Sequence, residues 1–167
     1  MSRPHLTVLG MPGSGKTTVG SIVAERAGLP LRDGDPALFD RTGRTAQEID
    51  ATDGVEALHA TEREVTRALL EDPEPAVVTP AASALDDPGT VDAIRAQSWL
   101  IVLLDIEPSV AAARAGTGDH RRPMDADEMA TRWSTRRPVA ASIADVILDA
   151  SQVPIELAER IAEIRAC

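Results

Sequence analysis

The sequence predicts a three-layer α/β domain built on a five-stranded parallel sheet. Short apolar runs alternate along the chain with longer stretches of helical periodicity, which is typical of parallel strands connected by helices. At 167 residues the chain is long enough to bury the core of one domain. Neither an internal repeat nor a linker divides it, so we expect residues 1–167 to form a single domain.

The expected strands are short apolar runs, each followed by a turn or by a helical pattern. Strands of a parallel sheet are apolar along most of their length, because helices cover both faces of the sheet. The runs cover 5–9, 29–32, 76–79, 99–104 and 146–148.

Start signals mark several helices between these strands. In Asp35-Pro36 we expect Asp35 to be the N-cap and the proline to be the first helical residue. Thr45 and Glu48 have the spacing of a capping box. The expected helices cover 14–26, a segment beginning at 35, a short one beginning at 45, 53–70, 108–115, a segment from about 125, and a closing one from 154.

A glycine-rich motif follows the first strand. Residues 10–17 read Gly-Met-Pro-Gly-Ser-Gly-Lys-Thr and match G-x-x-x-x-G-K-[ST] at every fixed position. Backbone N–H groups of such a loop cradle phosphates, the lysine reaches the outer phosphates, and the threonine hydroxyl binds Mg²⁺. Lys16 is the only lysine in the chain, which is otherwise supplied with arginine. The expected nucleotide-binding residues are Gly13, Ser14, Gly15, Lys16, Thr17 and Thr18.

Two other interpretations of this loop are possible. A chance glycine-rich turn is the plain alternative, and the strand–loop–helix context argues against it. A dinucleotide-binding G-x-G-x-x-G fails because Thr18 stands where the third glycine belongs, so a hydride-transfer enzyme is not expected.

Composition argues against several other classes of protein. A net charge of −10 with 2% aromatic residues argues against binding of nucleic acid. No apolar run approaches the roughly 18 residues of a membrane span. The chain reaches its first strand too early for a signal peptide, and its one cysteine, Cys167, can form no internal disulfide. We therefore expect a cytoplasmic monomer that binds a nucleotide and a small molecule.

Acidic residues are the first candidates for chemistry. Asp33 and Asp35 end the second expected strand, where they could position Mg²⁺ and accept a proton from an attacking hydroxyl. Ordinary turn chemistry is the alternative for both. Glu62 falls on the apolar stripe of its helix, which is costly unless it meets a cation or a ligand. The alternative is an arginine-paired residue at a half-exposed helix edge.

Arginines and a further aspartate complete the candidates. Arg121 and Arg122 lie in a glycine-bounded loop that could close over a nucleotide, although solvated surface charge is the alternative. Arg132 and Arg136 stand one helical turn apart and could face the same cleft. Asp105 ends an apolar strand that resembles a Walker B strand, which keeps an ATPase open as an alternative.

These features together resemble the shikimate kinase family over nearly the whole chain. Residues 10–18 match the family's phosphate loop, and 29–35 resemble its Asp-x-Asp segment. Glu62 falls where the family has a glutamate, and Arg122-Pro123 matches the Arg-Pro of its lid. Val153-Pro154 is similar to the turn that packs on adenine.

The resemblance implies a P-loop kinase fold with a substrate-binding subdomain at about 33–62 and a lid at about 114–124. The implied cofactors are ATP and Mg²⁺. The implied catalytic residues are Lys16, Asp35 and Arg122. The implied magnesium ligands are Thr17 and Asp33, and the implied adenine contacts are Arg114 and Pro154.

The acceptor side departs from the family pattern. The family has Glu-x-x-Phe-Arg in its substrate-binding helix, with an arginine that grips the substrate carboxylate, and His59 stands at that arginine's position. The family's Gly-Gly-Gly after the third strand is replaced by Pro-Ala-Ala-Ser at 80–83.

A second carboxylate-binding arginine of the family would fall at Ala141 or Ser142. Arg136 and Arg137 lie about one helical turn away and could substitute for it. The expected substrate-binding residues are Asp35, His59, Ala81, Ala82 and Arg136.

We therefore expect an ATP-dependent small-molecule kinase of shikimate kinase type. It would transfer the γ-phosphoryl group of Mg-ATP to a hydroxyl of shikimate or of another small acceptor. Two alternatives stay open: a catalytically impaired nucleotide-binding protein of the same fold, and a simple ATPase that uses Asp105.

Overall fold

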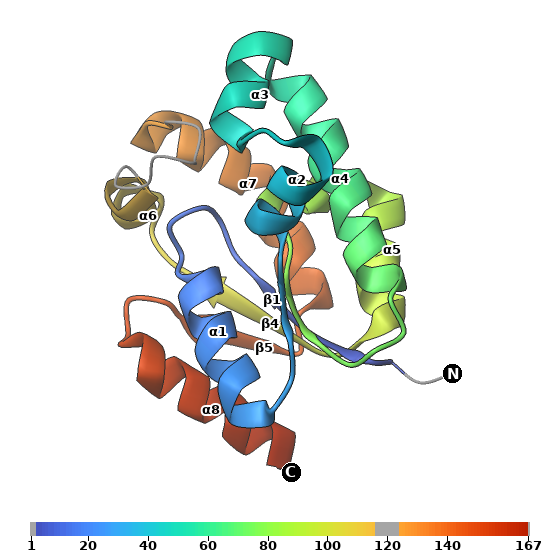
Figure 1. Ribbon diagram of the computed structural model, residues 1–167. Helices are drawn as coiled ribbons and strands as arrows, with labels where there is room; N and C mark the ends of the chain where they lie inside the picture. Colours follow the sequence, from blue (N-terminus) through green and yellow to red (C-terminus); the bar gives the residue numbers. More distant parts are fainter. Residues whose placement is uncertain (1–2, 116–123, 167) are drawn as a thin grey trace.

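The computed structural model describes residues 3–115 and 124–166, and it confirms the three-layer α/β fold (Figure 1). Its sheet has five strands, all parallel, in the order β2-β3-β1-β4-β5. The strands are β1 (His5–Leu9), β2 (Leu31–Asp33), β3 (Val77–Thr79), β4 (Ser98–Asp105) and β5 (Val146–Asp149).

Helices cover both faces of this sheet. They are α1 (Lys16–Ala27), α2 (Gly34–Thr42), α3 (Ala46–Asp53), α4 (Val55–Glu71), α5 (Pro88–Gln97), α6 (Pro108–Ala115), α7 (Ala126–Ile143) and α8 (Pro154–Ala166), with a 3₁₀ turn, η1 (Ala82–Asp86), before α5. Figure 1 shows α1 and α8 side by side on one face, and α4, α5 and α7 on the other. Within the described ranges, no helix has the length and apolar character needed to cross a membrane.

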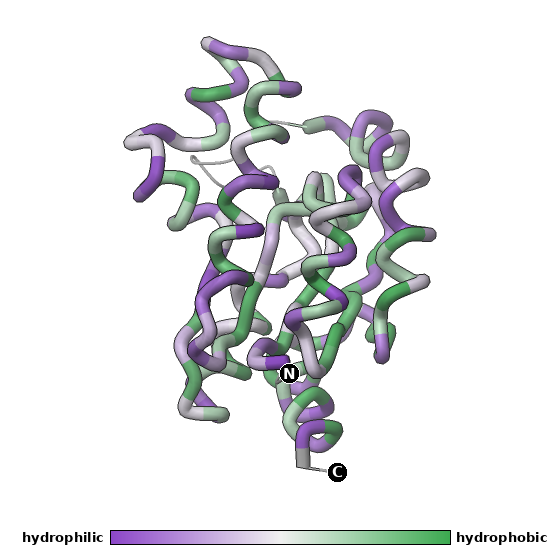
Figure 2. The backbone as a smooth tube through the Cα atoms, turned by 90° about the vertical axis from the view of Figure 1, so that its right-hand side faces the viewer, coloured by the Kyte–Doolittle hydropathy of each residue, from purple (hydrophilic) through white to green (hydrophobic). Residues whose placement is uncertain are grey.

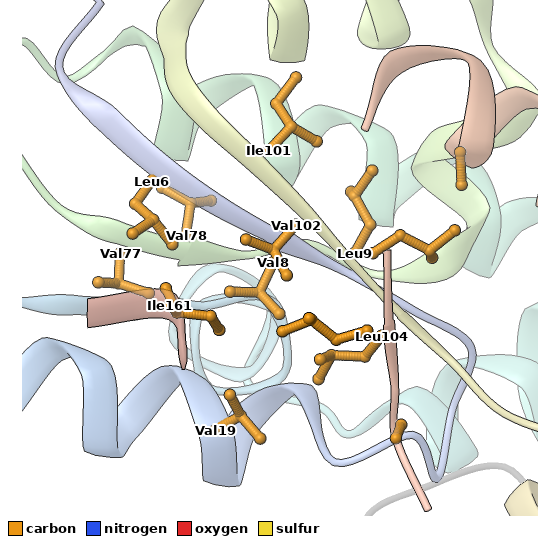
Figure 3. Packing of buried hydrophobic residues seen from close by; sticks show 14 of the residues in the cluster. Leu6, Val8, Leu9, Val19, Val77, Val78, Ile101, Val102, Leu104 and Ile161 are labelled. Carbon is orange, nitrogen blue, oxygen red and sulfur yellow. The ribbon is translucent and has the colours of Figure 1, made fainter. Parts of the chain in front are cut away.

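The core lies between the central strands and the two helix layers. Val8 of β1, and Val102 and Leu103 of β4, are fully buried. Val19 of α1 and Ile161 of α8 point toward these strands from one helix layer (Figure 3). In Figure 2 the hydrophobic colour follows the inner strands, whereas the peripheral helices carry most of the hydrophilic colour. This distribution is what the apolar runs of the sequence predict.

The start of α2 differs from the expectation. Asp33 is the N-cap, with extended backbone angles, and Asp35 lies in the first helical turn. The prediction that Asp35 caps this helix is therefore wrong, because β2 extends to Asp33 and leads directly into α2. The expected capping box of α3 is confirmed. Thr45 Oγ1 accepts from Glu48 N at 3.2 Å, and Glu48 Oε2 accepts from Thr45 N at 2.7 Å.

The 3₁₀ turn η1 and helix α5 were not predicted from the sequence. The start of α5 nevertheless carries a recognisable signal, since Asp87 is its N-cap and Pro88 occupies its first turn. Asp87 Oδ2 accepts from the Thr90 backbone N–H at 2.8 Å. Of this segment, Ala82 and Ser83 at the start of η1 line the pocket described below.

The parallel topology brings the carboxyl ends of the strands to one edge of the sheet. The glycine-rich loop follows β1 at this edge, Asp33 ends β2, and Thr79 ends β3. In the sheet, β1 has β3 on one side and β4 on the other, so the strand order changes direction at β1. Open α/β sheets bind ligands at such a switch point, so the fold itself positions a site there.

The paired residues Leu103 and Ile147 of β4 and β5 give a matched test of the core. Leu103 is fully buried, whereas Ile147 is 47% exposed. We expect Leu103→Ala to lower the free energy of unfolding by about 2–5 kcal/mol, because it leaves a cavity in the centre of the sheet. Ile147→Ala should cost less than about 1 kcal/mol. Urea unfolding measures both, and equal losses would contradict the assigned register.

Candidate active site

The glycine-rich loop is shaped by two residues with left-handed backbone angles, Gly13 at φ +83° and Gly15 at φ +90°. A Cβ atom at Gly13 would clash with the carbonyl oxygen of Ala111 in α6. Only glycine therefore allows the loop to pack this closely against that helix. Val19 N donates to Gly15 O at 2.9 Å and closes the first turn of α1, so the loop leads into a helix N-terminus.

Lys16 links the carboxyl ends of two strands. Its ammonium group donates to the carbonyl oxygen of Gly10, after β1, at 2.8 Å, and to that of Pro80, after β3, at 3.1 Å. The two oxygens hold the only lysine of the chain at the wall of a pocket. An ammonium group fixed beside a glycine-rich loop and a helix N-terminus forms a binding site for a polyphosphate.

Asp33 accepts hydrogen bonds at both of its carboxylate oxygens. Thr17 Oγ1 donates to Oδ2 at 2.9 Å, and Thr79 Oγ1 donates to Oδ1 at 2.9 Å. Oxygen atoms, such as those of hydroxyl and carboxylate groups, are the ligands that Mg²⁺ prefers. The described residues contain no group of three or more His, Cys, Asp or Glu side chains that could hold a metal ion alone. A magnesium ion held by few protein oxygens, with phosphates and waters completing its shell, fits this donor set.

Ser14 gives a second test of fit at the loop. Its hydroxyl is buried and has no hydrogen-bond partner among the described residues. A buried hydroxyl without a partner costs about 1–3 kcal/mol. An anion bound in the loop would remove that cost, so a phosphate fits these residues.

One pocket joins the loop to the strand ends and to α4 and α7. Its empty volume, which includes the open solvent at its mouth, is about 780 Å³. From the predicted phosphate and magnesium residues it brings together Gly13, Gly15, Lys16, Thr17 and Asp33. From the predicted acceptor residues it brings together Asp35, His59, Ala81, Ala82 and Arg136.

Glu62 lies in the same pocket, and its partner differs from the expected arginine. The Ser83 hydroxyl donates to Glu62 Oε2 at 2.6 Å. Burial raises the pKa of Glu62, and the negative charge of Asp35 acts in the same direction, against the opposing hydrogen bond from Ser83. The interpretation of Glu62 as an arginine-paired residue at a helix edge is therefore wrong.

His59 is a buried, neutral member of the pocket. Its exposed fraction is 7%, and burial lowers its pKa to about 4, with the charges of Arg136 and Arg132 acting in the same direction. The ring therefore stays uncharged near pH 7. It can exchange hydrogen bonds with a ligand but does not replace the positive charge of an arginine.

Arg136 projects from α7 into the pocket wall with only 5% of its surface exposed. Its Nε and Nη2 donate to the two carboxylate oxygens of Asp86 at 2.8 and 2.7 Å. Burial opposes ionisation of Asp86, but the hydrogen bonds and charge of Arg136 hold its pKa below the ordinary value. Ser142, where a family arginine was expected, is exposed and outside the pocket, so Arg136 is the α7 arginine that reaches this site.

Other predicted site residues lie elsewhere. Arg114 Nη1 donates to the carbonyl oxygen of Ala150 at 3.0 Å, which places this guanidinium beside the turn that leads to Pro154 and α8. Thr18 is exposed and contributes to a neighbouring hollow over α2. Arg122 and most of the expected lid, residues 116–123, lie outside the described residues.

Two arginines and Asp105 do not join the site. Arg137 donates through Nε and Nη2 to Asp105 at 2.7–3.1 Å, and both residues line a different hollow between α6 and α7. Arg132 donates to Glu128 at 3.2 Å and does not line the pocket with Arg136. The expectation that Arg132 and Arg136 face the same cleft is therefore wrong, because only Arg136 lines the pocket.

Thr79, Ser83 and Asp86 were not predicted from the sequence as site residues. Thr79 could have been found, because it ends a strand at the ligand-bearing edge. Asp86 carries no such signal, since its partner Arg136 is 50 residues away in the chain.

Comparison with known proteins identifies the family to which this chain is similar. A sequence model of shikimate kinase matches residues 12–165. Shikimate kinase from Thermobifida fusca (strain YX) is 35% identical, over 97% of this chain and 95% of that protein. Shikimate kinase from Mycobacterium ulcerans (strain Agy99) is 32% identical, over 89% of this chain and 82% of that protein.

Solved structures agree on the fold. A shikimate kinase from Acinetobacter baumannii, in complex with shikimate, superposes with a TM-score of 0.87 at 22% identity, covering 99% of this chain and 94% of that one. A gluconokinase from Sinorhizobium meliloti gives a TM-score of 0.66 at 23% identity, covering 99% and 98%. The family match spans most of the chain, and the sequence relatives exceed 30% identity along most of their length. The chain therefore belongs to the shikimate kinase family.

Proposed function

We propose that this protein is an ATP-dependent kinase of shikimate kinase type, which transfers the γ-phosphoryl group of ATP to a hydroxyl of a small acceptor. The observation that carries the proposal is that one pocket contains both Lys16 of the phosphate loop and the carboxylate of Asp35. Phosphoryl transfer needs a phosphate-binding end and a group that orients or deprotonates the attacking hydroxyl. Shikimate is the first acceptor to test, because it is the substrate named for the family.

At the nucleotide end, the loop N–H groups and Lys16 would bind the phosphates, and Gly13 keeps the loop tight against α6. Thr17 and Asp33 would hold Mg²⁺, whose charge stabilises the negative charge of the transferred group. Arg114, which donates to the carbonyl oxygen of Ala150, and Pro154, the first residue of α8, would contact the adenine.

At the acceptor end, Asp35 would orient the acceptor hydroxyl and accept its proton as the new O–P bond forms. The segment 33–62 would act as the substrate-binding subdomain, since it supplies Asp35, His59 and Glu62 to the pocket. A single cysteine suits a reducing, cytoplasmic setting.

The ATPase alternative has less support. Asp105 is held by Arg137 and lies in a hollow apart from Lys16 and Thr17. A carboxylate in that position is poorly placed to act on the outer phosphates of a nucleotide held by the loop.

Substitution of Asp35 tests the assignment. We expect Asp35→Asn to lower acceptor-dependent ADP release by about 10²–10⁴, because the amide cannot accept the hydroxyl proton. ATP affinity should change little, as measured by calorimetry. Asp92→Asn, an exposed carboxylate on α5, is the matched control and should leave the rate unchanged.

The assay compares ADP release with and without shikimate and other hydroxylated ring compounds at millimolar concentration. ADP release that no acceptor stimulates in the wild type would contradict the proposed transfer. Equal rates for Asp35→Asn and the wild type would contradict the role of Asp35.

A further inference from the structure

We propose that the acceptor end of this pocket selects an uncharged, polyhydroxylated ring over a carboxylate-bearing one, and that Asp86 sets this preference by offsetting part of the charge of Arg136. The inference rests on the proposed kinase activity and names the class of its acceptor. It follows from the charges that the described residues place around Asp35.

The arginine at the acceptor end of the pocket, Arg136, is already paired with a carboxylate. Apart from Lys16 at the phosphate end, Arg136 is the only cationic side chain among the described pocket residues. Two of its nitrogens already donate to both oxygens of Asp86 at 2.7–2.8 Å. Asp86 therefore offsets part of the guanidinium charge, as it does at His59, whose pKa Arg136 lowers and Asp86 raises. Its remaining nitrogen, Nη1, can still donate a hydrogen bond to a hydroxyl.

The histidine of the same pocket, His59, contributes no positive charge near pH 7. Burial lowers the pKa of His59 to about 4, so the ring is neutral at pH 7. The charges of Arg136 and Arg132 also lower this pKa, whereas those of Asp86 and Glu56 raise it, so burial is the main cause. A ligand carboxylate would therefore meet a neutral ring at this position.

The acceptor end of the pocket already contains carboxyl groups. Asp35 and Glu62 both line the pocket, and they lie close enough for Asp35 to raise the pKa of Glu62. A ligand carboxylate would be repelled by Asp35, and also by Glu62 in its ionised form, because like charges in one partly buried site disfavour one another. The net charge of −10 on the chain adds to this penalty at longer range.

The remaining features suit an uncharged ring. Hydrogen-bonding groups are available from Ser83, His59 and Arg136 Nη1, and each can serve a hydroxyl. Leu58 and Met124 supply apolar surface that can cover a ring face. Pockets with apolar walls and a few convergent polar groups are typical of sites for small polar molecules.

The test compares shikimate with its primary carboxamide, which keeps the ring and the hydroxyls and removes the charge. For the wild-type protein we expect kcat/KM for the carboxamide to exceed that for shikimate by about tenfold or more. A preference for shikimate, or equal values for the two compounds, would overturn the inference.

Calorimetry in the presence of ADP separates this inference from the proposed function. If neither compound is phosphorylated, the proposed transfer fails for this ring, but the charge preference is still read from the two dissociation constants. Tighter binding of the carboxamide supports the inference. Equal binding, tighter binding of shikimate, or binding of neither at millimolar concentration overturns it.

Asp86→Asn tests the positioning role of Asp86. Removal of its charge frees the positive charge of Arg136, so the kcat/KM ratio of shikimate to carboxamide should rise about tenfold or more. Asp87→Asn is the control, because Asp87 is the adjacent carboxylate, bonds Arg67 instead, and lies outside the pocket. Asparagine also retains its capping role on α5.

Thermal unfolding shows whether Asp86→Asn is folded, since it leaves a buried arginine without its carboxylate. In a folded variant, an unchanged ratio would overturn the role of Asp86. If the variant does not fold, the wild-type comparison alone decides the preference for an uncharged acceptor.

Discussion

The candidate site depends on the bonds between one ammonium group and two backbone carbonyls. Lys16 donates to Gly10 and Pro80, and so ties the loop after β1 to the segment after β3. These strands are direct neighbours in the sheet, with Leu6 opposite Val77 and Thr7 opposite Val78. The parallel register therefore fixes where the charge sits. The phosphate end and the acceptor end meet because the chain after β3 lines the same pocket as the loop.

A second constraint acts through Asp33. Its two oxygens accept from Thr17 and Thr79, so it joins α1, β2 and β3 at the sheet edge. Gly34 follows directly, and a Cβ there would lie 3.3 Å from the backbone nitrogen of Ala81. The close approach of these two segments places Asp35 opposite the segment 80–83. The geometry of the nucleotide end thus determines the position of the group proposed to act on the acceptor.

Much of this architecture could be predicted from the sequence, for local physical reasons. The glycine-rich loop, the capping box at Thr45 and the apolar strands are encoded by residues close together in the chain. The errors arose where contacts are distant in sequence or where one element leads directly into the next. Asp33 capped α2 in place of Asp35 because no turn separates β2 from that helix.

Distant contacts explain what could not be predicted at the acceptor end. The pairing of Arg136 with Asp86 joins α7 to η1 across 50 residues, and no local pattern announces it. The burial that keeps His59 neutral comes from the packing of several elements. The resemblance identified the position of His59 as altered, but only the folded arrangement shows that Arg136, the one arginine that the described residues place at the acceptor end, is already paired.

The central claim is that Lys16 and the surrounding loop bind a nucleoside triphosphate. Calorimetric titration with Mg-ATP tests it most directly, with Lys16→Ala as the variant and Arg26→Ala, an exposed residue on the same helix, as the control. We expect the wild type and Arg26→Ala to bind with similar affinity and Lys16→Ala to bind at least about tenfold more weakly. Absence of binding to the wild type at millimolar Mg-ATP, or unchanged binding to Lys16→Ala, would contradict the account.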